Sequence, residues 1–292
     1  MKVKNMEIKK PATIDEQIKK LTDRKCEIGD YEFAKMVLSR INYYRLTAYF
    51  LPFKTAEDTY MSNTTLEKIY QIHEFDCELR SLCFSAIEKI EIMLRVRLAY
   101  YHAQRYKALG YMCTDNFNKK HNSKKFQSFI ARTIKNNKDQ PFVKHHINNY
   151  DGQFPIWVII ELFTFGELSI FYSDMLTEDK KILSKQICHS TPKNMSSWLI
   201  CLTLLRNYCA HSSRLYYTLF SKTPATPTNL NYTLQNRIFD YIVIMNFFYP
   251  DKSEWLNNFV EPLCEMINKY KSYIELNHIG FPKNWFDILR EV

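Results

Sequence analysis

The feature that most constrains the fold of this chain is a tract, residues 66–109, that contains neither glycine nor proline. Apolar residues recur along it every three or four positions, which is the period of an amphipathic α-helix. The tract therefore predicts one long helix that ends at Gly110 and requires other elements around it to bury its apolar face. The recurring positions are Ile69, Ile72, Leu79, Cys83, Ile87, Ile90, Leu94, Leu98 and Tyr101.

The rest of the chain also favours helices over strands. Only five glycines occur in 292 residues, and no segment shows the alternation of a half-buried strand. We therefore predict an all-α, bundle-like protein, with a small N-terminal helical unit at residues 1–60 and a larger helical domain at residues 61–292. Further helices are expected over residues 14–24, after Gly29–Asp30, over 156–175, from 194 into the motif at 206–211, over 234–248 and over 254–276.

Composition excludes several classes of protein. The first residues do not form a signal peptide, and the eight cysteines include no Cys-x-x-Cys pair. We expect reduced, partly buried cysteines in a cytoplasmic protein, with neither a metal site nor a cofactor. The apolar stretch at residues 156–172 contains Glu161 and Glu167 and is short for a membrane span, so a buried core helix is expected there.

Positive charge is concentrated in one segment of a chain whose net charge is +9. Residues 119–146 contain eight Lys or Arg and a single acid, Asp139, with phenylalanine and asparagine between them. Such a basic insertion, at about residues 115–150, attracts a phosphate backbone, but a solvated lysine-rich loop has the same composition. The basic residues are Lys119, Lys120, Lys124, Lys125, Arg132, Lys135, Lys138 and Lys144.

The stretch from Arg206 to Arg214 contains the residue types best suited to chemistry. Asn207 and His211 are four residues apart, so both lie on one face of a helix, and the long side chain of Arg206 can reach the same cleft. An imidazole moves protons near neutral pH, a guanidinium binds a phosphate and its developing charge, and the amide could orient the imidazole. This trio suits cleavage of RNA without a metal.

The spacing of Arg206 and His211 alone favours a structural interpretation. A histidine at a helix end often caps carbonyl groups, and an arginine nearby often forms a surface ion pair. The surrounding sequence decides between the two interpretations.

Four blocks of sequence, in order, resemble the Abi family of bacterial abortive-infection proteins, in particular its AbiD/AbiF-like group within the HEPN superfamily. The resemblance extends from about residue 14 to about residue 214. The blocks are residues 41–49 (INYYRLTAY), 74–80 (EFDCELR) with 86–92 (AIEKIEI), 155–158 (PIWV) with 165–169 (FGELS), and 205–214 (LRNYCAHSSR).

The resemblance implies a phage-defence effector with a HEPN-like helical bundle. It implies that Arg206 and His211 are catalytic and that Asn207 occupies the polar position of the HEPN motif. The charged residues 88–97 of the long helix would face the same cleft. The basic segment and the N-terminal helices would bind RNA, which adds Tyr44, Arg45 and Arg214 to the eight basic residues above.

A mechanism follows from the chemistry of RNA cleavage. The ribose 2′-hydroxyl attacks the adjacent phosphorus and needs a base, while the departing 5′-oxygen needs an acid. Because one histidine does not serve both roles in a single step, we expect an active homodimer with two-fold symmetry, with a 2′,3′-cyclic phosphate and a 5′-hydroxyl as products. The resemblance also implies a partner, a small structured non-coding RNA in a toxin–antitoxin pair. The alternative is a non-catalytic RNA-binding defence protein that is stored as a ribonucleoprotein.

Overall fold

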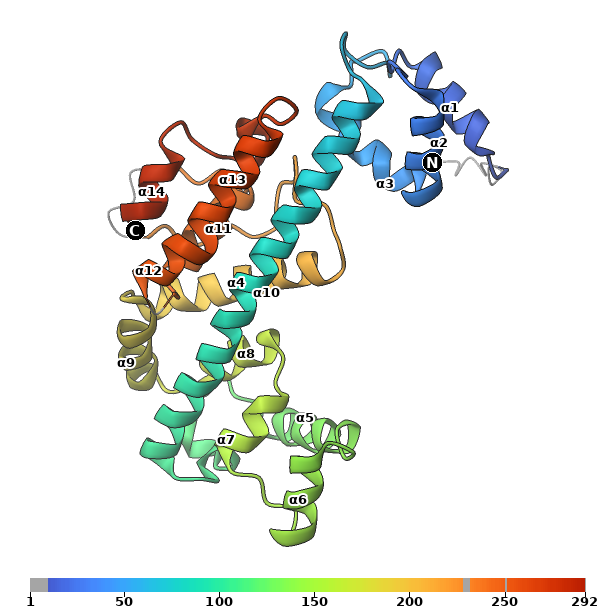
Figure 1. The fold of residues 1–292 in the computed structure, drawn as a ribbon. Helices are drawn as coiled ribbons and strands as arrows, with labels where there is room; N and C mark the ends of the chain where they lie inside the picture. The colour runs from blue at the N-terminus through green and yellow to red at the C-terminus, as the bar shows by residue number, and fades with distance from the viewer. Residues whose placement is uncertain (1–9, 228–231, 250, 292) are drawn as a thin grey trace, which may run out of the picture.

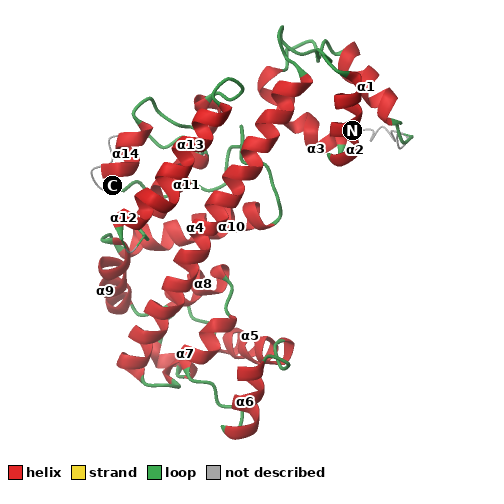
Figure 2. Ribbon diagram, viewed as in Figure 1, coloured by secondary structure: helices red, strands yellow, loops and turns green. Residues whose placement is uncertain are grey.

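The structure is a computed structural model that describes residues 10–227, 232–249 and 251–291. These residues form helices joined by loops, and within them no β-strand occurs beyond isolated bridges (Figure 2). The all-α fold class predicted from the sequence is confirmed.

Helix α4 (Leu66–Tyr106) confirms the long helix expected from the tract without glycine and proline. The hydroxyl of Thr65 caps its first turn by accepting a hydrogen bond from the amide of Lys68 at 3.0 Å. At the other end, Lys107 has a φ of 66°, a left-handed conformation that stops the helix. Helix α4 runs along most of the molecule, so elements from both the N-terminal and C-terminal regions pack against it (Figure 1).

Three short helices lie at the N-terminal end of α4. They are α1 (Ile14–Asp23), α2 (Tyr31–Arg40) and α3 (Tyr43–Thr47), followed by a 3-10 helix at Ala48–Phe53. Asp30 caps α2 by accepting hydrogen bonds from two amides of its first turn. The first two helices expected from the sequence are thereby confirmed, while the division into domains at residue 60 stays a prediction.

The basic segment is mostly helical, so the alternative of a lysine-rich loop is wrong for most of its length. It forms α5 (Ser123–Asn136) and α6 (Pro141–Asn149). Asn122 caps α5 by accepting a hydrogen bond from the amide of Lys125 at 2.9 Å, and a proline opens α6. Ile130 and Val143 are buried and anchor the two helices to the rest of the fold.

The single helix expected over residues 156–175 is wrong. The chain forms α7 (Ile156–Ile159) and a 3-10 turn at Ile160–Leu162, and then starts again as α8 (Phe165–Asp174). Thr164 and Glu167 form a capping box in which each side chain accepts a hydrogen bond from the other residue's amide. This capping box begins a new helix inside a stretch whose apolar pattern predicted a single continuous helix. Helix α9 (Thr177–Cys188) follows.

The C-terminal part packs α10 (Pro192–Ala210) and α11 (Ile238–Asn246) against α4. The helices expected over residues 234–248 and 254–276 are both present, in shorter form. The second contains a π-helical turn, Leu256–Val260, between α12 (Lys252–Trp255) and α13 (Glu261–Tyr270). Helix α14 (Trp285–Glu291) closes the described chain.

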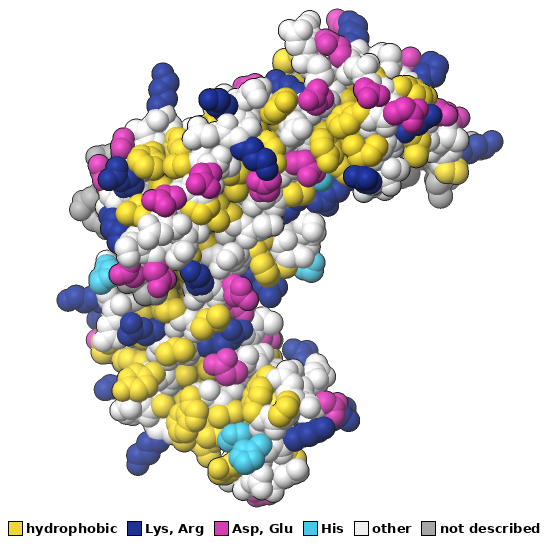
Figure 3. All heavy atoms as spheres, viewed as in Figure 1, with side chains coloured by type: hydrophobic (Ala, Val, Ile, Leu, Met, Phe, Trp, Pro, Cys, Tyr) yellow, Lys and Arg dark blue, Asp and Glu magenta, His cyan; other side chains and the backbone are white. Residues whose placement is uncertain are grey.

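The molecule is curved along α4. The N-terminal helices lie at one end and α5 and α6 at the other, and the C-terminal end of α10 lies on the concave side between them (Figure 1). The space-filling view shows this side as a hollow, with Lys and Arg side chains along its margin (Figure 3). The fold therefore places the end of α10 opposite both flanking groups of helices.

Candidate functional site

Helix α10 carries the Arg-to-His motif on its last turns. Its first turn has Thr191 as cap and Pro192 at the first position. Its last turn ends at Ala210, with His211 as the C-cap residue, and Ser212 has a φ of 53°. The amides of Ser212 and Ser213 donate to the carbonyls of Cys209 and Tyr208, at 3.1 and 2.8 Å, which is the pattern of a Schellman motif. The helix therefore ends sharply, directly at His211.

Arg206 points from α10 toward α4. Its Nε lies 3.9 Å from Oε2 of Glu91, and its guanidinium carbon lies 5.7 Å from the ring centroid of Phe84. Glu91 is buried and also accepts a hydrogen bond from Arg95, one turn further along α4. Arg95 in turn donates to the carbonyl of Phe163 at 2.9 Å. Glu91 and Arg95 of the long helix therefore line the same pocket as Arg206, while a cleft that they share with the whole motif stays a prediction.

The two arginines of this cluster have unused donors. The Nε atoms of Arg95 and Arg206 are both buried, and neither has a hydrogen-bond partner in the described part of the chain. A buried guanidinium N–H without a partner costs free energy, and a ligand with acceptor oxygens can recover it. The cluster is thus suited to an anion.

Two pockets flank the cluster. One, of about 420 Å³, is lined by Arg95 and Arg206 together with Asn137, Gln140 and Phe142 from the junction of α5 and α6. The other, of about 250 Å³, lies on the side of Phe84, Glu88 and Ile92. The structure therefore brings the end of the basic segment to the same pocket as the motif arginine, although about 70 residues separate them in sequence.

His211 and Asn207 are exposed at the end of α10. The amide of His211 donates to the carbonyl of Asn207 at 3.0 Å, but no hydrogen bond joins their side chains in the described structure. Neither residue lines the two pockets beside Arg206. Arg206 thus lies in a partly buried cluster, while the imidazole is open to solvent and to a second macromolecule.

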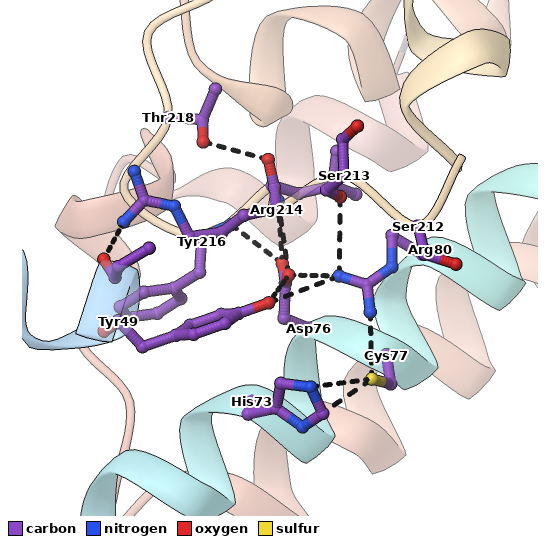
Figure 4. A network of polar contacts seen from close by, with 12 residues as sticks. Tyr49, His73, Asp76, Cys77, Arg80, Ser212, Ser213, Arg214, Tyr216 and Thr218 are labelled. Atoms are coloured by element: carbon purple, nitrogen blue, oxygen red, sulfur yellow. Dashed lines mark hydrogen bonds and ion pairs between the residues drawn. The ribbon is translucent and has the colours of Figure 1, made fainter. Parts of the chain in front are cut away.

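The loop after the motif is fixed by a buried network around Asp76 of α4 (Figure 4). The carboxylate of Asp76 accepts hydrogen bonds from the hydroxyl of Tyr49 at 2.7 Å and from the amides of Leu215 and Tyr216 at 3.1 and 2.8 Å. It also pairs with Arg80, which donates to the carbonyl of Ser213 at 3.5 Å. Burial raises the pKa of Asp76, and the charge of Arg80 and these hydrogen bonds oppose the rise. The network holds the segment that directly follows His211.

Two of the residues predicted to bind RNA, Arg45 and Arg214, help to hold the same loop. Arg45 donates to the carbonyl of Ser212, and Arg214 donates to the carbonyl of Ala48 at the end of α3. Burial lowers the pKa of Arg214, whose guanidinium also lies over the ring of Tyr49. Both arginines join the motif loop to the N-terminal helices, and their contact with RNA stays a prediction, as does that of the exposed Tyr44.

The eight basic residues predicted to bind RNA all have exposed side chains. Within the described residues, one of them forms an ion pair, Lys144 with Asp139 at 3.6 Å. The others leave their charge available to an external anion. They lie on α5, on α6 and in the adjoining turns: Lys119, Lys120, Lys124, Lys125, Arg132, Lys135, Lys138 and Lys144.

The structure also brings together residues that the sequence analysis did not single out. Ligand atoms of His73, Glu74 and Cys77 lie within 4.8 Å of one another, as in a metal site. However, a guanidinium nitrogen of Arg80 lies 2.9 Å from the sulfur of Cys77, so a cation there would meet a positive charge. The i, i+4 spacing of His73 and Cys77 was the available signal, but this spacing is common in helices.

The fold and site define a helical protein built on one long helix, with an arginine cluster and an exposed histidine at the end of a second helix. The family model described as Abi-like protein matches residues 36–217, more than half of the chain, and the protein belongs to this family. This confirms the resemblance to the Abi family and indicates a role in abortive infection, a defence against phage, while the AbiD/AbiF-like group and the HEPN superfamily stay predictions. No curated protein and no solved structure gave a match. Among the described residues, no helix is both long and apolar enough to cross a membrane.

Proposed function

We propose that this protein is an abortive-infection effector of the HEPN type that binds structured RNA and cleaves it without a metal. The observation that carries the proposal is the pocket shared by Arg206 and the junction of α5 and α6. Asn137 and Gln140 of this pocket lie at the junction of the two helices that carry most of the basic segment, so one RNA would contact both Arg206 and those helices. Growth arrest of the infected cell would follow from this cleavage.

The arginine cluster would bind the scissile phosphate. A phosphate in the pocket that Arg206 and Arg95 both line would accept hydrogen bonds from their guanidinium groups. Glu91 lies between the guanidinium groups and keeps them close despite their like charge. These fixed donors would stabilise the negative charge that develops on the phosphate as the 2′-oxygen attacks.

His211 would transfer the protons. One imidazole takes the proton of the 2′-hydroxyl as the new P–O bond forms, and another gives a proton to the 5′-oxygen as the P–O5′ bond breaks. Two imidazoles require two copies of the chain. We therefore propose a two-fold homodimer in which each copy contributes its His211.

An apolar ridge beside the arginine cluster would form the dimer interface. Ile92, Val96 and Tyr100 of α4 are spaced four residues apart and are exposed by 55%, 58% and 68%. Ile92 also lines the smaller pocket beside Arg206. A second copy that covers this ridge would bring the two arginine clusters close to the two-fold axis, which is why we assign the ridge to a copy of this chain.

The replacement His211→Ala tests the proposal. We expect cleavage of a labelled RNA hairpin to fall by at least about 100-fold, because proton transfer is lost, while binding of the RNA changes little. His189→Ala is the matched control, since this histidine also lies at a helix C-terminus, that of α9. Full cleavage by the His211→Ala variant would refute the assignment.

The composite site is tested by mixing subunits. If both imidazoles act in one site, a 1:1 co-expression of wild-type and His211→Ala chains leaves about a quarter of the dimers active. If each chain acts alone, half of the activity remains. If the cleavage activity falls linearly with the fraction of wild-type chains, rather than with its square, the homodimer is not part of the mechanism.

One observation favours a second candidate, a non-catalytic RNA-binding protein stored as a ribonucleoprotein. His211 does not line the pockets beside Arg206, so the motif could bind RNA without cleaving it. Expression of the Arg206→Ala and His211→Ala variants distinguishes the two: if both still arrest growth fully, cleavage is not the mechanism. Sequencing the nucleic acid that co-purifies with the protein would show whether a discrete small non-coding RNA is its partner, as in a toxin–antitoxin pair.

A further inference from the structure

A groove between α5 and α8 lies apart from the motif and has no role in the proposed cleavage. It has a volume of about 340 Å³ and is open to solvent. Its floor is formed by the rings of Phe126, Phe129 and Phe171, and its rim carries Lys120, Lys125 and Arg132. An apolar floor with a few charged groups at the edge is typical of a site for a small, partly apolar ligand.

Basic residues outnumber acidic residues in the lining of this groove. Two acidic residues, Glu167 and Asp174, also line it. The carboxylate of Glu167 is held in the capping box by the amide and hydroxyl of Thr164, at 2.7 and 2.9 Å. The carboxylate of Asp174 lies 2.9 Å from Nδ1 of His121. The basic side chains of the rim have no ion-pair partner within the described ranges, so the groove presents free positive charge.

The aromatic floor is accessible. Phe126 and Phe129 are partly buried and remain in contact with solvent, whereas Phe171 is buried beneath them. The three rings belong to one cluster, with centroids of Phe126 and Phe171 at 6.3 Å and of Phe126 and Phe129 at 6.1 Å. Such packing holds the rings in place, which lowers the entropy lost when a flat ligand stacks on them.

We infer that this groove binds one unpaired nucleotide of the RNA, with the base on Phe126 and Phe129 and the adjacent phosphates on Lys125 and Arg132. The inference rests on the proposed RNA-binding function and deepens it. An aromatic ring stacks on any base, and lysine and arginine bind the backbone on either side. Paired bases are enclosed in the helix, so the groove selects loops, bulges and ends over duplex.

This groove would therefore give the protein a preference for RNA with unpaired nucleotides over continuous duplex. The exposed lysines of α5 and α6 attract any phosphate backbone, whereas a concave site for a single base requires that the base be unstacked. A hairpin with an open loop meets both conditions, and a continuous duplex meets only the first.

Binding of two RNAs tests the inference: a hairpin with 2-aminopurine in its loop, and a continuous duplex of the same stem sequence. The variant Phe129→Leu removes a ring but keeps an apolar side chain. We expect it to weaken hairpin binding by about tenfold and to abolish quenching of 2-aminopurine, with little change for the duplex.

Three further variants, all at exposed residues, show whether the effect of Phe129→Leu is only a loss of folding. Ile170 lines the groove, and its side chain is 60% exposed, so Ile170→Glu adds a negative charge there without disturbing the core. It should reproduce the loss of hairpin binding. Lys125→Gln should weaken hairpin binding more than Lys124→Gln, because both lysines are exposed on the same turn of α5 but only Lys125 lines the groove.

The outcomes separate this inference from the proposed function. If the wild-type protein cleaves RNA and the Phe129→Leu and Ile170→Glu variants bind the hairpin like the wild type, the groove is not a nucleotide site and the cleavage proposal stands. Equal losses for hairpin and duplex would also overturn the groove as a base site. If the hairpin binds through the groove but is not cleaved, the inference stands and the nuclease proposal fails.

Discussion

Helix α4 carries two pairs with the same sequence pattern, an acidic residue followed four positions later by an arginine. Asp76 and Arg80 form the first pair, and Glu91 and Arg95 form the second. The carboxylate of Asp76 is fully buried and accepts hydrogen bonds from a tyrosine, two amides and its arginine. The second pair borders two pockets and leaves a guanidinium N–H without a partner.

The difference shows that the pattern alone does not define the role of a charged pair. A closed pair, whose hydrogen bonds are all made within the protein, organises the structure around it, here the loop that follows His211. An open pair retains unused donors at a pocket and is available to a ligand. The third arginine, Arg206, joins only the open pair. The comparison thus distinguishes a structural pair in the N-terminal half of α4 from a pair further along α4 that borders two pockets.

The largest effect is expected from Asp76→Ala. This replacement leaves Arg80 buried without its partner and two backbone amides without an acceptor, so the free energy of unfolding should fall by about 3–5 kcal/mol. Chemical denaturation measures the change. The matched control is Glu91→Ala in the open pair, which should lower the free energy of unfolding by less than half as much. Similar losses in the two variants would contradict the distinction between closed and open pairs.

The open pair is expected to affect activity more than stability. Replacing Arg95 by Gln removes one of the two guanidinium groups at the proposed phosphate site, and RNA cleavage should fall by about 100-fold or more. Arg97→Gln is the control, since Arg97 is exposed two residues further along α4 and lines neither pocket. An Arg95→Gln variant that unfolds more easily but cleaves at the wild-type rate would make this pair structural too.

His102 extends the comparison to a polar side chain of α4 that forms no hydrogen bond with the described residues. It is fully buried among Tyr106, Phe117 and Phe171, and both ring nitrogens lack a hydrogen-bond partner in the described structure. Burial lowers its pKa to about 4, and the charge of Asp179 opposes the shift only in part.

Acid should therefore destabilise the protein through His102. As the pH falls from about 6.5 to about 4, the unfolded chain binds a proton that the folded chain does not, so stability is lost over this window, up to about 3 kcal/mol. In His102→Phe, which keeps an aromatic ring, this part of the loss should disappear. The shift of the denaturation midpoint between pH 7 and pH 4.5 measures this loss. If the shift is the same in His102→Phe and in the wild type, the acid sensitivity belongs to other groups.

Much of the architecture followed from local sequence. The absence of glycine and proline over residues 66–109 predicted α4, and the helices expected from residue 14, after Gly29–Asp30 and from residue 194 are present as α1, α2 and α10. The break at Thr164 was missed, since a capping box in an apolar stretch competes with a helical period that continues across it. The family was also recognised correctly from its four blocks.

The candidate site was predictable only in part. The residue types of the Arg-to-His motif indicated phosphate chemistry, and the charged turns of the long helix indicated a second contributor. The packing of distant segments decides which of those charges lie beside Arg206. It also decides that the junction of α5 and α6 lies there. Arg214 shows the same limit, because its sequence position next to the motif gave no sign that it would bond to Ala48.

The sequence by itself determined most of the helices and their approximate ends, the location of the basic segment and the family. These properties depend on residue type and on spacing within a few turns, where each residue meets its neighbours along the chain. Tertiary structure alone decided that Asp76 and Arg80 form a closed pair and that Glu91 and Arg95 form an open one. The two pairs are alike in sequence. Only the elements packed around them, and the hydrogen bonds that those elements supply, enclose one pair and leave the other at the edge of two pockets.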